Sequence, residues 1–316
     1  MEIASQKPRG LDWKRLACPA WSIVKRVAWD ILRAGSAGLN EQERLHGSRN
    51  AVGHASAFTR IDLIVTLALA VLFGGWFVVN HTGERGRIAG CARNLKVLGQ
   101  AILSEADDHG NELVPAELNV GKIERSWDTE LFPYLNPSLG RTTDPEAKEQ
   151  LFSSVSPRFQ CPSDTLLRRA PRTYTMPSRN MTLGWPPTPD DETGVGVFWN
   201  KQTIASLLGE EAWPAALARP ETLERLKLSV LPVPAATLVL TELVARRNIV
   251  KHTGWARVAS AARRQAVFEM DPSRFHFGRF NYLMSDGHVE WLSDLQVGGN
   301  SDAPSGIWTI KGGDRR

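Results

Sequence analysis

The chain has little cysteine, with three residues in 316 and no C-x-x-C pair. This scarcity argues against a dithiol redox motif and against a cysteine-rich zinc site. The sequence also lacks G-x-S-x-G, the phosphate-binding P-loop, the dinucleotide fingerprint G-x-G-x-x-G and the zinc-protease motif H-E-x-x-H. We therefore expect a protein that is not an enzyme and has no catalytic residues.

Most of the chain also lacks net charge. Nine Lys and Arg residues against five acids in residues 1–57 account for the whole formal excess of +4, so residues 58–316 are neutral. A neutral body is a poor partner for a polyanion, and we expect no binding to nucleic acid. Positive charge that flanks an apolar run is typical of the cytoplasmic side of a membrane segment.

An apolar run without a charged residue extends from Leu63 to Val79. Its 17 residues would form a helix of roughly 25 Å, the short end of a membrane span. The sequence thus predicts a transmembrane helix over about residues 61–79, and the alternative is a buried helix of a soluble protein. A conventional signal peptide is disfavoured because the run starts so far from Met1 and no A-x-A site follows it.

Apolar residues continue at spacings of three and four after Val79, which predicts that the helix extends to about residue 109. The spacing is carried by Ile88, Cys91, Leu95, Leu98, Ile102 and Ala106. We therefore divide the chain into a basic leader (1–57), a long helix (58–109) and an α+β head (110–316). The predicted fold is this helix packed against a globular head with an antiparallel β-sheet.

Local patterns predict several elements of the head. Residues 201–208 and 220–228 are expected to be helices, and residues 237–244 and 306–310 strands. Residues 280–285 and 288–292 alternate in polarity on either side of Asp286-Gly287. Asp-Gly suits the two positive φ values of a type I′ turn, so a β-hairpin is expected here.

The hairpin and the residues just before it contain side chains that could ligate a metal. His276, Asp286 and His288 fall within thirteen residues. Zinc needs three or four nitrogen, sulfur or oxygen donors, and calcium needs several oxygens. We prefer the simpler interpretation, in which Asp286 and Gly287 form the turn and His276 packs or hydrogen-bonds, with no cofactor.

A processing signal of a known kind precedes the apolar run. Ala57 is followed by Phe58, and Asp62 stands fifth when Phe58 is counted first. This arrangement resembles the cleavage site of type IV prepilins and type II secretion pseudopilins. The resemblance implies cleavage between Ala57 and Phe58 by a prepilin peptidase, methylation of Phe58, and a role for Asp62 in assembly. Prepilins usually have Gly and Glu where this chain has Ala57 and Asp62, so an uncleaved leader and a helix-capping Asp62 are the alternatives.

A second resemblance lies in the rest of the chain. His276 and Asp286-Gly287 form an H-X9-DG pattern, residues 91–99 read C-x-x-N-L-K-x-L-G, and residues 161–164 read C-P-S-D. These motifs resemble those of the bacterial pilin-like family whose C-terminal domain is named for H-X9-DG. The resemblance covers about residues 55–314 and implies a pilin-like architecture.

Cys91 and Cys161 would both follow a membrane segment at residues 61–79. Two cysteines exported to an oxidising compartment can pair, and the alternative is two buried free thiols. Sequence alone does not place them within bonding distance.

These observations lead to two functional hypotheses. The first is a pilin- or pseudopilin-like structural subunit of a secretion pseudopilus or related filament, whose partners are a prepilin peptidase and other pilin-like subunits. It would cross the inner membrane once, with a cytoplasmic N-terminus and a periplasmic or extracellular head. The second hypothesis keeps the anchor but makes the head a non-assembling domain that binds carbohydrate or cargo.

Overall fold

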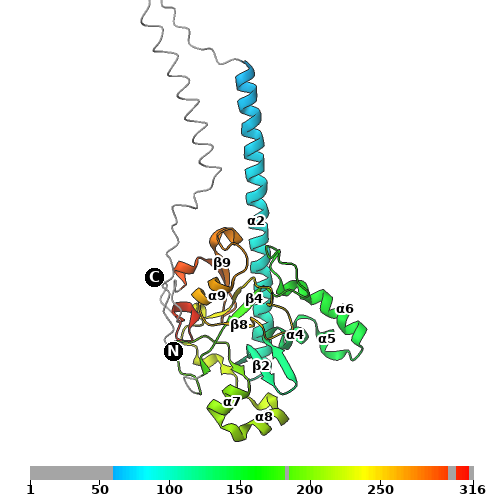
Figure 1. Cartoon of the computed structure of the whole chain (residues 1–316), viewed down its shortest axis with the longest axis vertical. Coiled ribbons are helices and arrows are strands. Elements are labelled where there is room, and N and C mark those ends of the chain that lie inside the picture. The colour runs from blue at the N-terminus through cyan, green and yellow to red at the C-terminus, as the bar shows by residue number, and fades with distance from the viewer. Residues whose placement is uncertain (1–59, 182–184, 298–303, 313–316) are drawn as a thin grey trace, which may run out of the picture. The chain divides into compact units, whose positions relative to one another are not determined.

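The computed structural model describes residues 60–181, 185–297 and 304–312. The chain divides into two units, Met1–Leu67 and Ala68–Arg316. In the first unit the described residues, 60–67, begin helix α2 (Arg60–Asp108). The second unit is α+β: it contains the rest of α2 and a head rich in short strands (Figure 1). Ala57 and Phe58 lie outside the described residues, so cleavage between them stays a prediction.

The main sheet of the head has five strands in the order β10-β9-β7-β4-β8. All neighbours are antiparallel except β4 and β8, so the sheet is mixed rather than purely antiparallel as predicted. Every residue of β4, β7 and β9 is buried. Its strands are β4 (Tyr174–Pro177), β7 (Leu238–Glu242), β8 (Arg257–Val258), β9 (Phe280–Met284) and β10 (Val289–Leu292).

Two smaller sheets and several short helices complete the head. The small sheets have the orders β3-β2-β5 and β1-β6. Their strands are β1 (Glu112–Leu113), β2 (Glu117–Val120), β3 (Ile123–Ser126), β5 (Phe198–Trp199) and β6 (Leu226–Lys227). The helices after α2 are α3 (Trp127–Glu130), α4 (Phe132–Leu135), α5 (Pro137–Arg141), α6 (Pro145–Val155), α7 (Lys201–Leu208), α8 (Trp213–Ala218) and α9 (Ala261–Val267).

The C-terminal half of α2 is part of the core. The side chains at the three-and-four spacing noted in the sequence are buried against the head, except Ile88, which is half-buried. Gly99 marks a close approach, since a Cβ placed there would lie 2.7 Å from Leu283 Cδ1 of β9. A glycine at this point of the helix therefore lets α2 lie directly on the sheet. The buried residues on this face are Cys91, Leu95, Leu98, Ala101, Ile102 and Ala106.

The predicted membrane segment is corrected by the structure. In the part of the chain that is described, no helix combines the length and apolar character needed to cross a membrane. The prediction of a transmembrane helix over residues 61–79 is therefore wrong, and so is the predicted single-pass location in the inner membrane. The apolar run from Leu63 to Val79 would by itself span roughly 25 Å, whereas the hydrocarbon core is about 30 Å thick.

Other local predictions also fail. Residues 220–228 contain a 3₁₀ turn (Pro220–Thr222) and strand β6, and a second 3₁₀ turn begins at Leu228, so they do not form one helix. Residues 306–310 contain a 3₁₀ turn (Gly306–Trp308) rather than a strand. Pro220 does stand in the first turn of a helix, where its missing N–H costs nothing, but that helix is a short 3₁₀ turn. Helix α7, by contrast, has the predicted bounds, and an Asn200–Thr203 capping box fixes its start.

Candidate functional site

One residue from each of the motifs C-x-x-N-L-K-x-L-G, C-P-S-D and H-X9-DG lies in a buried cluster between α2 and the sheet. Glu84 and Cys91 come from α2, Cys161 from the C-P-S-D turn, Glu242 from the end of β7, and His276 from the H-X9-DG motif. All five residues are buried. We call this set the clasp, because it joins the long helix to the head through one covalent bond and a chain of charged hydrogen bonds.

The covalent part of the clasp is a disulfide between Cys91 and Cys161. Their Cα atoms lie 4.8 Å apart, within the usual range for a disulfide, although the cysteines are separated by 70 residues in sequence. Ser163, two residues further along the C-P-S-D turn, donates its hydroxyl to Glu84 Oε1 at 2.8 Å. The C-P-S-D turn is therefore bonded to α2 at two positions, Cys91 and Glu84, which lie about two helical turns apart.

His276 is the centre of the polar part. Its Nδ1 lies 2.8 Å from Glu84 Oε1, and its Nε2 lies 3.1 Å from Glu242 Oε1. With a carboxylate facing each ring nitrogen, both N–H groups donate when the ring is protonated. Burial alone would lower the pKa of His276, but the negative charge of Glu242 and the hydrogen bonds to Glu242 and Glu84 outweigh it and raise the pKa.

The two carboxylates are held by other partners as well. Glu242 accepts from the backbone N–H of Asn281 at 2.8 Å and from its side-chain amide at 2.9 Å. Burial would raise the pKa of Glu84, but hydrogen bonds from His276, Ser163 and Arg87 lower it overall. Each buried acid is thus satisfied, as a buried charge requires.

The backbone at His276 is in an uncommon conformation. His276 (φ 49°) and Phe277 (φ 60°) are both in the left-handed region and are followed by Gly278 (φ 76°). Such a conformation costs of order 1–3 kcal/mol per non-glycine residue and persists only where the surroundings enforce it. The contacts of His276 with two carboxylates provide that enforcement, and the left-handed turn in return places its ring between α2 and β7.

The tip of the H-X9-DG hairpin has a different role. Strands β9 and β10 are antiparallel, with Leu283 opposite Val289. Gly287 has φ 89°, but Asp286 has a negative φ, so the turn is not type I′ as predicted. The bonds from Met284 N to His288 O and from Gly287 N to Met284 O instead close a three-residue loop, in which glycine takes the left-handed position.

His288 also lies between two carboxylates, but at the surface. Its Nδ1 contacts Asp286 and its Nε2 lies 3.0 Å from Glu290 Oε1. The side chains of His288 and Asp286 are 37% and 38% exposed. Burial would raise the pKa of Asp286, but the backbone and side-chain hydrogen bonds from His288 lower it.

The predicted trio of metal ligands is therefore divided between two sets of contacts. His276 belongs to the clasp, whereas Asp286 and His288 pair at the hairpin tip. Within the described ranges, a group whose ligand atoms all lie within 4.8 Å of one another is formed instead by Cys91, Cys161, Glu242 and His276. Asp62 falls within α2, but its side chain lies outside what the structure describes, so its role in assembly stays a prediction.

Sequence reasoning missed Glu84 and Glu242, the partners of His276. One signal was available for Glu242, because an acid at the end of a largely apolar strand needs a partner if it is buried. Glu84 had no such signal, since it lies 192 residues from His276 and next to exposed Arg85.

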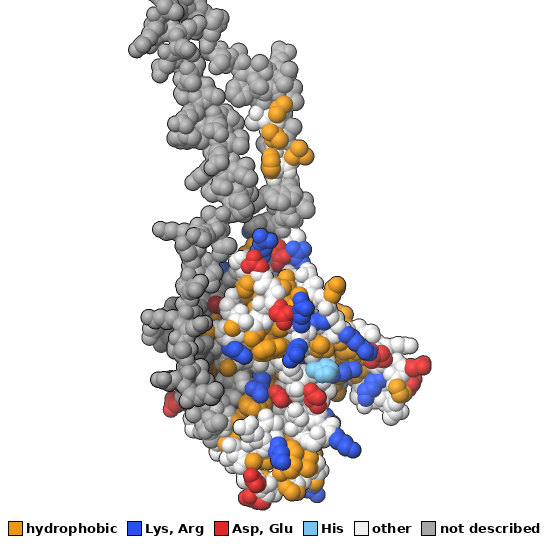
Figure 2. All heavy atoms as spheres, viewed as in Figure 1, with side chains coloured by type: hydrophobic (Ala, Val, Ile, Leu, Met, Phe, Trp, Pro, Cys, Tyr) orange, Lys and Arg blue, Asp and Glu red, His pale blue; other side chains and the backbone are white. Residues whose placement is uncertain are grey.

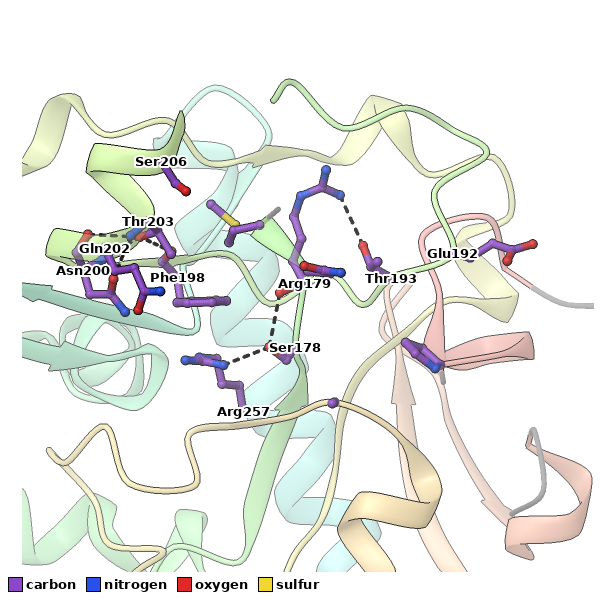
Figure 3. A pocket seen from close by; sticks show the side chains of 14 residues that line it. Ser178, Arg179, Glu192, Thr193, Phe198, Asn200, Gln202, Thr203, Ser206 and Arg257 are labelled. Carbon is purple, nitrogen blue, oxygen red and sulfur yellow. Dashed lines mark hydrogen bonds between the residues drawn. The ribbon is translucent and has the colours of Figure 1, made fainter. Parts of the chain in front are cut away.

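A separate cavity of about 630 Å³ lies on the head, lined by side chains from the segment after β4, from β5 and α7, and from β8 (Figure 3). Arg257 reaches into its wall, donates to Ser178 Oγ at 3.0 Å, and lies 3.4 Å above the ring of Phe198. Each arginine of the wall pairs with an acid, Arg257 with Glu117 and Arg179 with Asp191. The cavity thus offers hydrogen-bonding groups more than net charge.

Among known proteins, no family model, no curated protein and no solved structure matches the chain.

Proposed function

We propose that this protein is a pilin-like structural subunit that associates with further copies of itself through the N-terminal part of α2. Its head would then be the part presented to other partners. The observation that carries the proposal is the contrast along α2, whose C-terminal half is locked into the head while its N-terminal part exposes large apolar side chains.

The exposed residues share one side of the helix. Leu69, Leu72 and Phe73 are 47%, 68% and 67% exposed. Spacings of three and four place them next to one another, as a helix that packs against another helix requires. They contribute to the apolar side chains on this part of α2 in Figure 2.

The clasp supports the same proposal mechanically. If α2 carries the assembly face, the head must be attached rigidly to α2 to be held in place in an assembly. The disulfide and the contacts of His276 provide this attachment. Cleavage by a prepilin peptidase and pairing with other pilin-like subunits belong to this proposal as expectations from the resemblance.

Sedimentation of the purified full chain tests the proposal. Leu72→Glu places a charge in the proposed helix contact, and we expect it to weaken self-association by about tenfold or more, since an unpaired charge is costly to bury. Arg85→Ala, which changes net charge by the same single unit at an exposed position of α2, is the matched control. A wild-type chain that stays monomeric at high concentration, or equal association of both variants, would refute the proposal.

The cavity beside Arg257 favours a second candidate function, binding of a neutral polar ligand such as an oligosaccharide by the head. Its lining combines amide and hydroxyl side chains with the ring of Phe198, a mixture suited to hydroxyl groups and an apolar sugar face. Thermal unfolding with a panel of neutral oligosaccharides tests it. A shift that Gln202→Ala abolishes would favour this function, and no shift with any sugar would eliminate it.

A further inference from the structure

Four potential metal ligands converge in the clasp. The Sγ atoms of Cys91 and Cys161, a carboxylate oxygen of Glu242 and a ring nitrogen of His276 all lie within 4.8 Å of one another. His276 Nε2 is the nitrogen that faces this group, at 3.2 Å from Cys161 Sγ and 3.1 Å from Glu242 Oε1. All four residues are buried, so water has no direct access to the centre of the group.

We propose that the clasp is a redox-dependent metal site, which holds a disulfide when oxidised and one Zn²⁺ ion when reduced. The zinc ligands would be Cys91, Cys161, His276 and Glu242. Two thiolates, one imidazole and one carboxylate are a donor set that suits zinc, which accepts sulfur, nitrogen and oxygen in tetrahedral sites. Four protein ligands without an open position would make the site structural rather than catalytic.

The surroundings of the four ligands favour this role. Metal-binding histidines usually donate their second ring N–H to a carboxylate, which fixes the tautomer and orients the ring. His276 has this arrangement, because its Nδ1 faces Glu84 Oε1 at 2.8 Å and its Nε2 faces the sulfur and the oxygen. Glu242 is oriented in turn by the backbone and side-chain N–H groups of Asn281.

The exchange between the two states balances. A phosphine and one water molecule convert the disulfide to two thiols, and the phosphine becomes a phosphine oxide. Zn²⁺ then displaces one proton from each thiol, which become thiolate ligands, and binds Nε2 of His276 in its deprotonated form. Either state joins α2 to the C-P-S-D turn and the sheet, so the attachment of the helix would survive reduction only where zinc is present.

Cobalt titration of the full chain, in a Cys18→Ser background that removes the third thiol, tests the proposal. After reduction by a phosphine and removal of the reagent, we expect one equivalent of Co²⁺ to bind with thiolate-to-cobalt charge transfer and the intense visible bands of tetrahedral cobalt. Zinc should displace it. The oxidised chain should give neither signal, and equal binding by the oxidised chain would overturn the proposal.

Two variants separate this site from adventitious binding. Glu84→Gln removes the charge behind His276 and should weaken cobalt binding by about 10–100-fold while the tetrahedral spectrum is retained. Glu290→Gln, the matched change beside exposed His288, should leave binding unchanged. Loss of the signal in Glu290→Gln, or no effect of Glu84→Gln, would place the metal elsewhere and refute the assignment.

Circular dichroism of the reduced chain covers the remaining case. If reduction unfolds the protein, zinc should restore the folded spectrum, because metal binding then supplies folding free energy. A reduced chain that remains folded without binding cobalt, or that stays unfolded in the presence of zinc, contradicts the proposal.

Discussion

Two histidines of this protein lie between pairs of carboxylates, and they differ chiefly in burial. His276 lies between Glu84 and Glu242 with a fully buried side chain, whereas His288 lies between Asp286 and Glu290 with 37% of its side chain exposed. The acids of the buried set come from distant parts of the chain, and those of the surface set lie two residues away on either side. A histidine between two carboxylates therefore joins α2 to the sheet at His276, whereas at His288 the same arrangement lies on the surface of a hairpin tip and joins no distant elements.

The energetic consequence of this difference follows from solvation. An exposed ion pair gains little, because water screens it and competes for its hydrogen bonds. In a buried set each charge depends on its partners, and removal of one leaves the others uncompensated. We therefore expect the clasp to add little net free energy of folding, whereas removal of any one of its members should strongly destabilise the protein.

The largest expected effect comes from His276→Ala. Loss of the imidazole leaves Glu84 and Glu242 facing each other without the intervening cation, which should lower the free energy of unfolding by about 3–5 kcal/mol. Urea denaturation of the full chain measures this change. His288→Ala is the matched control and should cost about 0.2–1 kcal/mol. Equal costs for the two variants would refute the distinction between the two sites.

The covalent half of the clasp should have the next largest effect. Replacing Cys91 and Cys161 together by alanine removes a cross-link across 70 residues of chain, and we expect a loss of about 2–4 kcal/mol. The free energy of unfolding in urea, compared with that of the oxidised wild type, is the measurement. A double variant as stable as the wild type would mean that the polar half alone holds α2.

Two glycines of α2, one packed against the sheet and one exposed, allow a comparison with smaller expected changes in stability. Gly99→Ala would push a methyl group against Leu283 of β9 and should cost about 1–3 kcal/mol. Gly86→Ala changes the same helix where nothing lies within 4 Å of the added Cβ, and should stabilise the protein by about 0.5–1 kcal/mol. Melting temperatures of the two variants should therefore shift in opposite directions, and shifts of the same sign would contradict this view of the helix.

Features set by residues close together in the sequence could be predicted from it, whereas contacts between residues far apart in the sequence could not. The spacing of apolar residues after Val79 matches the helix that ends at Asp108, and alternation predicted the two strands of the final hairpin, because both patterns are local. His276 was noted for its motif, but its two acids were not, since only the tertiary fold brings Glu84 and Glu242 to it. The membrane helix was predicted wrongly from an apolar run alone, since no helix in the described part of the chain combines the length and apolar character needed to cross a membrane.

The pH dependence of stability offers the finest comparison of the two histidines. The pKa of His276 is raised above its ordinary value of 6.5, so its stabilising effect is fully present below about pH 6.5 and is lost as the pH rises through the raised value. The pKa of Glu84 is lowered below 4.5, so its contribution is present above about pH 4.5 and is lost as the pH falls through the lowered value. The clasp should therefore stabilise the protein most between about pH 4.5 and 6.5.

Urea denaturation across this range isolates the contribution of His276. In the wild type and in His288→Ala, the free energy of unfolding should decline as the pH rises above about 6.5, whereas in His276→Ala that decline should be reduced. The change should be smaller than that caused by His276→Ala at fixed pH, because deprotonation removes the charge but leaves the imidazole and its packing in place. If the decline persisted unchanged in His276→Ala, another group would be titrating, and the buried imidazolium would not be what joins Glu84 of α2 to Glu242 of β7.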